Sequence, residues 1–266
     1  MSPKDLVVFL EQARHGSDRR LAYAAELAKR WQAHLIATFV LRPLALEPYA
    51  GFAVGAGLSA MLETYQAKKA SAVQAARQEF DFLTGNRSFS AEWRISDDES
   101  HEALMLHARH ADLAILGPPA RQRTAASVLG LAEHLIFASG RPCLLLPDEW
   151  PAERLPQRIV IGWNGSREAT RSIADAMPFL ADAESVHLVV APRAGTKDLH
   201  GQEPGADIAA HLSRHGVSVV LEQSLGEDAG SILLGRCAAV DADLLVMGAK
   251  GRSEVSEFLF GGATRT

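Results

Sequence analysis

Glycines and cationic side chains gather in one short stretch of the sequence. Residues 248–253 read Gly-Ala-Lys-Gly-Arg-Ser, and Gly261 and Gly262 follow after seven further residues. Glycine lets the backbone turn sharply and leaves main-chain N–H groups uncovered. Such N–H groups bind anions when the N-terminus of a helix lies behind them, and Lys250 and Arg252 add positive charge. The pattern predicts a loop that binds a phosphate group.

The position of this loop agrees with that chemistry. It directly follows the apolar run Leu-Leu-Val-Met at 244–247, which is typical of a buried strand in a parallel sheet. Ligands of open α/β sheets bind beyond the carboxyl ends of the strands, where the strand order reverses. We therefore expect the glycines at the ligand-binding edge of a parallel sheet. The same glycines would also suit a tight strand-to-helix turn without a ligand, and this structural interpretation stays open.

The elements that position the loop recur in both halves of the sequence. Apolar runs at 6–10 and 159–163 each precede a Gly-Ser pair and a segment of helical pattern. Further along, residues 112–117 read Asp-Leu-Ala-Ile-Leu-Gly and residues 243–248 read Asp-Leu-Leu-Val-Met-Gly. Because both matches occur in the same order, the pattern predicts a tandem duplication.

Within the first copy, strand and helix patterns alternate. We expect strands at 6–10, 34–40, 89–95, 112–116 and 142–146, and helices at 17–31, 59–83, 99–110 and 125–139. Such alternation implies right-handed crossovers and a mostly parallel sheet that helices cover on both faces. The predicted fold class is therefore α/β, with two domains of this kind in tandem.

The domain limits follow from the prolines between the copies. Pro147, Pro151 and Pro156 stand among mixed charges, which is typical of a linker. We expect a first domain at 1–147, a linker at 148–157 and a second domain at 158–266. Only five residues follow Gly261, whereas the first copy places a helix and a strand after its last loop glycine. The second domain is therefore expected to lack its last helix and strand, which would weaken nucleotide binding.

The corresponding loop of the first copy keeps the spacing but loses the chemistry. Gly117 is followed by Pro118 and Pro119, which have no backbone N–H to offer a phosphate. After Gly130 comes Leu131, which is apolar. We expect no phosphate binding in the first domain, and a role as the pairing partner of the second.

The motifs resemble those of a known family. Residues 247–253 together with 260–265 closely resemble the signature loop of the universal stress proteins, and residues 160–166 resemble their first strand and turn. The resemblance covers the whole chain, and it is specific in the second half and faint in the first. It implies two flavodoxin-like (adenine nucleotide alpha hydrolase-like) domains, each with a five-stranded sheet, whose association resembles a dimer. It also implies binding of ATP or AMP, with or without Mg²⁺, where the loop is intact.

Carried over position by position, the resemblance implies a nucleotide site in the second domain. Its residues would be Gly162, Trp163, Asn164, Val190, Met247, Gly248, Lys250, Gly251, Arg252, Gly261, Gly262, Ala263 and Thr264. Two positions depart from the family. Asn164 stands where nucleotide-binding members have an Asp, so it brings no charge. Gly262 stands where many members have Ser or Thr, and Thr264 is the nearest hydroxyl.

Composition excludes several other classes of protein. The chain has 266 residues, and 27 Lys and Arg against 32 Asp and Glu give a net charge of −5 without a basic block, which argues against nucleic-acid binding. Apolar stretches are all shorter than the roughly 18 residues that span a bilayer. Two cysteines fit a reducing compartment. We expect a cytoplasmic protein without a metal site, since His211 and His215 have ligand spacing but no third ligand in the sequence nearby.

Three functions from different classes remain open. The favoured one is a regulatory stress-response module that binds an adenine nucleotide in its second domain, with a homodimer as an alternative to pairing of the domains within one chain. The second is a slow ATP hydrolase, for which Glu254 and Glu257 are the carboxylates close to the loop. The third is an interaction module that binds no nucleotide.

Overall fold

The structure, a computed structural model, divides the chain into two compact units. It describes residues 2–11, 17–41, 56–85, 88–96, 101–118, 131–190, 203–224 and 228–249. Residues 3–153 form the first unit, and residues 154–266 with the first two residues form the second unit. The domain limits and the linker expected from the sequence stay predictions. Each unit is described by itself.

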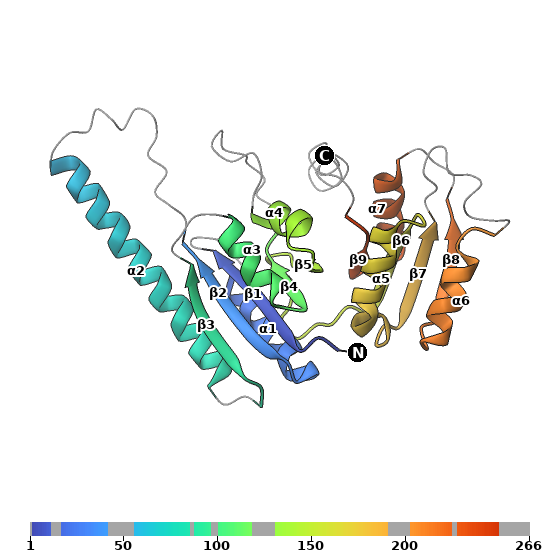
Figure 1. Ribbon diagram of the computed structural model, residues 1–266, viewed down its shortest axis with the longest axis horizontal. Coiled ribbons are helices and arrows are strands. Elements are labelled where there is room, and N and C mark those ends of the chain that lie inside the picture. Colours follow the sequence, from blue (N-terminus) through green and yellow to red (C-terminus); the bar gives the residue numbers. More distant parts are fainter. Residues whose placement is uncertain are drawn as a thin grey trace. The chain divides into compact units, whose positions relative to one another are not determined.

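The first unit holds a parallel sheet of five strands. These are β1 (Asp5–Glu11), β2 (His34–Val40), β3 (Ala91–Ser96), β4 (Leu113–Leu116) and β5 (Cys143–Leu145), in the order β3-β2-β1-β4-β5. The helices are α1 (Ser17–Trp31), α2 (Ala56–Thr84), α3 (His101–Arg109) and α4 (Leu131–Ala138). The chain runs from β1 through β2 to β3, and then returns past β1 to β4 and β5. Because each crossover is right-handed, α1 and α2 cover one face of the sheet and α3 and α4 cover the other (Figure 1).

Among its described residues, the second unit has the same arrangement with four strands. Its strands are β6 (Arg158–Trp163), β7 (Ser185–Val190), β8 (Val219–Gln223) and β9 (Leu244–Val246), in the order β8-β7-β6-β9 and all parallel. Its helices are α5 (Arg167–Leu180), α6 (Ala206–Arg214) and α7 (Ala229–Ala239). The α/β class with two parallel sheets is thereby confirmed. The predicted loss of a last helix and strand concerns residues beyond 249, which lie outside the described residues.

The central strands are buried because helices cover both faces of each sheet. The side chains of 6–10 in β1 are at most 1% exposed, and Ile159, Val160 and Ile161 in β6 are fully buried. On one face of the first sheet, α3 and α4 pack Leu104 and Leu135 against Val7 and Phe9. The continuous apolar runs in the sequence are therefore explained by burial on both faces, as in other parallel sheets.

One polar contact recurs in the two units and fixes where β4 and β9 begin. The carboxylate of Asp112 accepts hydrogen bonds from the backbone N–H groups of Lys4 (2.8 Å) and Asp5 (3.1 Å). Asp243 accepts two such bonds, both at 3.0 Å, from Arg158, the first residue of β6, and from Gln157 just before it. The matched aspartates found in the sequence thus have the same structural role, because each accepts hydrogen bonds from the N–H groups at the start of the neighbouring strand.

Predicted and observed bounds agree for some elements and differ for others, and the helix predicted at 59–83 is observed at Ala56–Thr84. The bounds predicted for α1 and β2 are those observed. The third strand, predicted at 89–95, is observed at Ala91–Ser96, where half-buried and exposed positions mix. A strand at the edge of a sheet is apolar on only part of its surface, so its pattern fixes its bounds less well. Of the helix predicted at 125–139, the described part is Leu131–Ala138.

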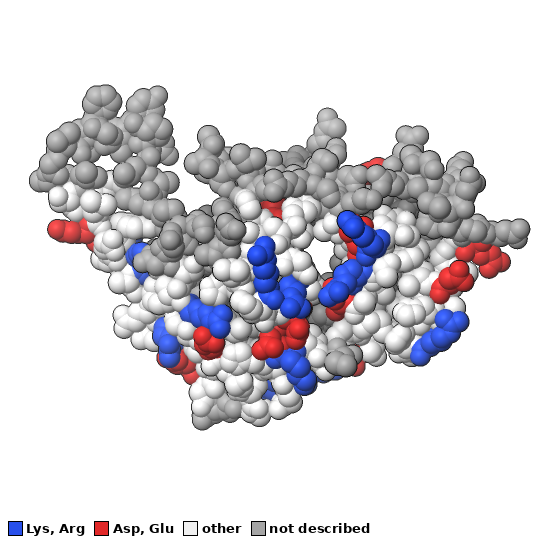
Figure 2. Space-filling model, viewed as in Figure 1, with Lys and Arg blue, Asp and Glu red and all other residues white. Residues whose placement is uncertain are grey.

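The surface of the described residues mixes charges of both signs. On the face in Figure 2, many basic side chains lie beside acidic ones, and pairs such as Arg77–Asp81 (2.9 Å) join them. Among the helices that the structure describes, none combines the length and the apolar character needed to cross a membrane.

Candidate functional site

The carboxyl ends of β6 and β9 bring the two halves of the predicted site together. The strands pair through Ile161 and Val246, so continuing that register sets Met247 and Gly248 beside the end of β6. The chain leaves β6 for β7 on one side, whereas β9 lies on the other, so the strand order reverses here. This reversal is where open α/β sheets bind ligands. The sheet topology therefore supplies the edge that the sequence motifs require.

The turn after β6 is held by its own side chains. The Asn164 Oδ1 accepts a hydrogen bond from the Ser166 N–H (3.1 Å), and Gly165 adopts a φ of +70°. Ser166 then caps α5, because its hydroxyl accepts from the Ala169 N–H (3.2 Å). This geometry assigns the oxygen of Asn164 to the turn. An Asp at position 164 could make the same bond, so the turn itself does not require the charge that Asn164 lacks.

Gly248 is required by packing as well as by any ligand. A Cβ atom at this position would lie 2.6 Å from the Ala169 N and 2.6 Å from the carbonyl carbon of Glu168. Contacts this short with backbone atoms cannot be relieved by rotating a side chain. The strand end therefore lies directly against the first turn of α5, which is the close helix–strand approach that glycine permits. The structural interpretation of this glycine is supported at 248, and a phosphate role is compatible with it.

Two other predicted residues also serve the core. A Cβ atom on Gly162 would lie 2.8 Å from Leu233 Cδ1, so the lack of a side chain at this position lets α7 pack closely against the sheet. Val190 is 2% exposed, and its Cγ2 lies 2.6 Å from where Gly205, at φ +90°, would carry a Cβ. Its carbonyl accepts the Ser224 N–H at 3.2 Å. Val190 can thus offer a ligand only its backbone.

The remaining predicted residues divide into two groups. Trp163 and Met247 are half-buried and Asn164 is exposed at the edge of the sheet. The others lie outside the described residues: Lys250, Gly251, Arg252, Gly261, Gly262, Ala263 and Thr264, with the carboxylates Glu254 and Glu257 of the hydrolase alternative.

The first unit fills the same edge differently. By sheet register Leu6 matches Ile159, so Glu11 stands where Asn164 stands in the second unit. The guanidinium of Arg20, 1% exposed, donates to the Phe9 carbonyl (3.0 Å) and pairs with Asp148 at 3.3 Å. A Cβ on Gly117, the counterpart of Gly248, would lie 2.3 Å from Arg20 Nη2. A side-chain cation therefore occupies the edge of the first unit.

Structures of other proteins share this fold. Neither the models of protein families nor the sequences of curated proteins contain a match to this chain. A universal stress protein from Archaeoglobus fulgidus has a TM-score of 0.65 at 13% identity, over 97% of this chain and 90% of that chain. The chain has the fold of the universal stress proteins. A functionally unknown protein from Pseudomonas aeruginosa PAO1 also matches, with a TM-score of 0.55, 15% identity, and coverage of 97% and 89%.

The universal stress fold assigns no ligand at these levels of identity. A universal stress protein in complex with cAMP matches 56% of this chain and all of that chain at 17% identity. Its TM-score of 0.38 is too low to support an argument about ligands. What the fold does establish is the topology, and with it the edge at which β6 and β9 end.

Other groups with chemical potential lie elsewhere. Burial raises the pKa of the Cys143 thiol to about 12, and it also raises that of Cys237, so neither is a ready nucleophile. His211 on α6 and His215 at its C-cap are both exposed, with ring centroids 4.7 Å apart. Among the described residues, no three His, Cys, Asp or Glu side chains are grouped as metal ligands would be.

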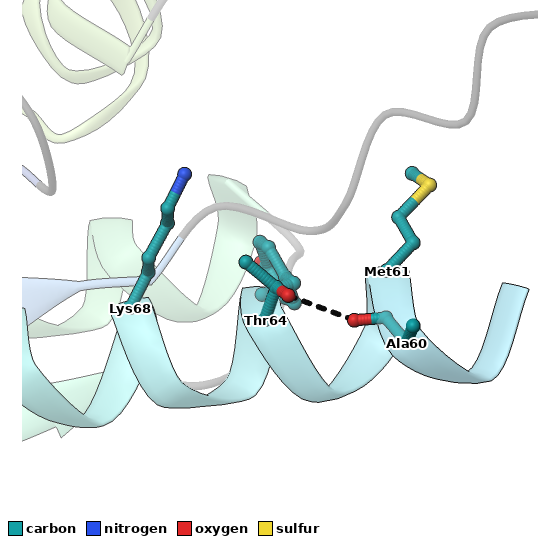
Figure 3. A pocket seen from close by; sticks show the side chains of 5 residues that line it. Ala60, Met61, Thr64 and Lys68 are labelled. Carbon is teal, nitrogen blue, oxygen red and sulfur yellow. Dashed lines mark hydrogen bonds between the residues drawn. The ribbon is translucent and has the colours of Figure 1, made fainter. Parts of the chain in front are cut away.

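A hollow on α2 is a poor candidate for the site. Ala60, Met61, Thr64, Tyr65 and Lys68 line it, all from one helix (Figure 3). Thr64 donates its hydroxyl proton to the Ala60 carbonyl (2.8 Å), so this polar group is engaged within the helix. A ligand site normally brings polar groups together from several elements, and the carboxyl edge of the second sheet meets that requirement better.

The sequence did not identify Arg20 and Asp148 as site residues. Arg20 lies in the run Asp-Arg-Arg at 18–20, which resembles a solvated helix start. The sequence did contain one indication that Arg20 differs from its counterpart in the second copy. If the two Gly-Ser pairs are superposed, Arg20 falls on Ala169, so a long cation replaces a small residue beside the strand ends.

Proposed function

We propose that the second unit binds an adenine nucleotide at the carboxyl ends of β6 and β9, and that the chain is a universal stress protein acting as a regulatory stress-response module. One observation carries the proposal. The register of β6 and β9 brings the Asn164 turn next to Met247 and Gly248, which lead into the glycine-rich loop. The turn motif and the first residues of the signature loop thus lie at the point where the strand order reverses, which supports the proposal.

Within this proposal, a triphosphate is the first ligand to test. Lys250 and Arg252 bring two positive charges to the loop, and glycines at 248 and 251 leave backbone donors for phosphate oxygens. We expect ATP with Mg²⁺ to bind more tightly than AMP, because AMP presents a single phosphate. The adenosine would lie against Trp163, Asn164 and Met247, as the resemblance implies.

The proposal also covers the cellular compartment of the protein and its state of assembly. Both cysteines are free, which suits the reducing cytoplasm. Pairing of the units within one chain, or formation of a homodimer, stays part of the proposal. Light scattering separates these two states by a factor of two in mass.

A matched pair of variants tests nucleotide binding. Gly251→Val places a branched side chain in the loop of the second unit, and Ala120→Val makes the corresponding change in the first. Titration calorimetry with Mg–ATP should show one site per chain, an affinity lower by at least about tenfold in Gly251→Val, and no change in Ala120→Val. Equal losses in the two variants, or no heat of binding by the unaltered chain, would contradict the proposal.

A second measurement separates binding from hydrolysis. Mass spectrometry of the small molecules released from freshly purified protein identifies a bound nucleotide directly. Steady phosphate release that Gly251→Val abolishes and Glu254→Gln preserves would indicate turnover linked to binding. Loss of turnover in Glu254→Gln with binding intact would instead favour the ATP hydrolase.

A further inference from the structure

A buried arginine lies where the first sheet would bind a ligand. Arg20 reaches from α1 over Gly117, and its Nη1 donates to the Phe9 carbonyl (3.0 Å) near the end of β1. Strands β1 and β4 pair through Val8 and Ile115, so the guanidinium lies by the strand pair at which the order reverses. A positive charge thus stands at the ligand edge of a unit whose own loop carries prolines.

The carboxylate that pairs with this arginine is partly open to solvent, whereas the arginine is not. The Asp148 side chain is 32% exposed and that of Arg20 is 1% exposed, and 3.3 Å separates Nη2 from Oδ1. A guanidinium keeps its proton at every accessible pH, so burial requires anionic or hydrogen-bonding partners around it. Asp148 belongs to no helix or strand. It can therefore leave the guanidinium without unfolding an element of the first sheet.

The second unit has no counterpart to this pair among its described residues. The matching place beside Gly248 is taken by the backbone of Glu168 and Ala169. There the positive charges belong to Lys250 and Arg252 in the loop. In the first unit a cation reaches the ligand edge from α1, and in the second unit we expect cations from the loop proposed above.

We propose that Arg20 is the centre of an oxyanion site in the first unit, and that Asp148 occupies this site as an internal substitute for the ligand. The planar guanidinium suits a phosphate or another oxyanion, which it can bind through two parallel N–H groups. An entering oxyanion takes the place of the Asp148 carboxylate. The segment 147–153 is then released from α1, so the site couples an anion to the chain that leads out of the first unit.

The test uses the full chain with inorganic phosphate as the probe. Asp148→Asn removes the internal competitor, and Arg20→Met/Asp148→Asn removes the receptor as well. All variants carry Gly251→Val, so that binding in the proposed loop of the second unit does not contribute. Equilibrium dialysis with labelled phosphate should show at least about tenfold tighter binding by Asp148→Asn than by its parent, and none by the variant that lacks Arg20.

Thermal unfolding gives a second readout. Phosphate stabilises many proteins nonspecifically, so each melt is compared with chloride at equal ionic strength. We expect an additional phosphate-dependent rise in the melting temperature of Asp148→Asn that the double change removes. Asp175→Asn, which breaks the Arg171–Asp175 pair (3.0 Å) of the second unit, is the matched control and should melt as its parent does.

Hydrogen exchange of individual segments gives a third readout. Hydrogen exchange in the parent should show phosphate protecting α1 while it exposes residues 147–153. Absence of phosphate binding by Asp148→Asn, or equal binding with and without Arg20, would overturn the proposal. So would failure of Asp148→Asn to fold at any phosphate concentration, because the proposal requires an external oxyanion to replace the lost carboxylate. Each of these results is independent of nucleotide binding by the second unit.

Discussion

The two units end their central strands in the same topology, but different atoms fill the edge. In the first unit the guanidinium of Arg20 lies over Gly117, and in the second the backbone of α5 lies against Gly248. The first edge is therefore occupied by a side chain, whereas the second edge is followed in the sequence by glycines and two cations. The topology that the two units share therefore sets where a ligand could bind, and a few side chains decide whether that place is open.

The largest expected effect comes from adding a methyl group at the two matched glycines. Gly248→Ala brings a Cβ within 2.6 Å of backbone atoms of α5, so strand and helix must separate. Gly117→Ala meets the end of a side chain instead. We expect a loss of about 3 kcal/mol in the free energy of unfolding for Gly248→Ala and about 1 kcal/mol for Gly117→Ala.

Urea unfolding of each variant measures these losses, and hydrogen exchange assigns each loss to its unit. If Gly117→Ala costs as much as Gly248→Ala, the guanidinium of Arg20 is as rigid as backbone and the contrast between the two edges is wrong.

The matched aspartates give the next largest effect. Asp243 is 4% exposed and pairs with Arg154 and Arg158 in addition to its two backbone N–H groups, whereas Asp112 is 44% exposed. Hydrogen bonds to a buried charged group are worth about 2 kcal/mol. We expect Asp243→Asn to cost about that much, and Asp112→Asn about 1 kcal/mol or less, in urea unfolding.

The same aspartate predicts a dependence on pH. Burial alone would raise the pKa of Asp243. Hydrogen bonds from the backbone N–H groups of Arg158 and Gln157, together with the charges of Arg154 and Arg158, outweigh this effect. The pKa of Asp243 is therefore lowered overall. A lowered pKa in the folded state means that the stabilisation is present above the unfolded value, about 3.9. It is lost as the pH falls through the folded pKa.

Acid titration of the second unit checks this sign. Unfolding followed through its amides should shift with pH below about 4 in the parent chain, and this part of the shift should be absent in Asp243→Asn. An unchanged dependence of stability on acid pH in Asp243→Asn would show that Asp243 does not cause it.

The smallest expected effect lies at a helix start. Asp228 caps α7, because its carboxylate accepts from the N–H groups of Gly230 and Ser231, both at 3.1 Å. Asp228→Ala should cost about 1 kcal/mol, without changing nucleotide binding. Circular dichroism and urea unfolding measure the loss, and Asp228→Asn, which keeps an accepting oxygen, should restore most of it.

The sequence predicted the fold well because burial leaves a strong pattern. The runs at 6–10 and 34–40 are apolar since helices cover both faces of the sheet, and their strands are found where expected. At the edge strand β3, polar and apolar side chains mix, so its bounds were shifted by one or two residues.

The site was harder to predict because its residues serve more than one purpose. The spacing of glycines does not tell a phosphate contact from a close strand–helix approach, and at Gly248 the structure shows the second. The buried Arg20 pairs with Asp148, which is far away in the sequence. No local pattern of charge or hydropathy contains that information, because the charged run at 18–20 also suits a solvated start of a helix.

One measurement tests the central claim most directly: hydrogen exchange of the full chain with and without Mg–ATP. The account predicts protection at 160–166 and 247–249 in the second unit, with one nucleotide bound per chain, and unchanged exchange at 6–11 and around Gly117 in the first. Protection confined to the first unit, or equal protection of both edges, would contradict the claim that the nucleotide binds specifically at the edge of the second unit.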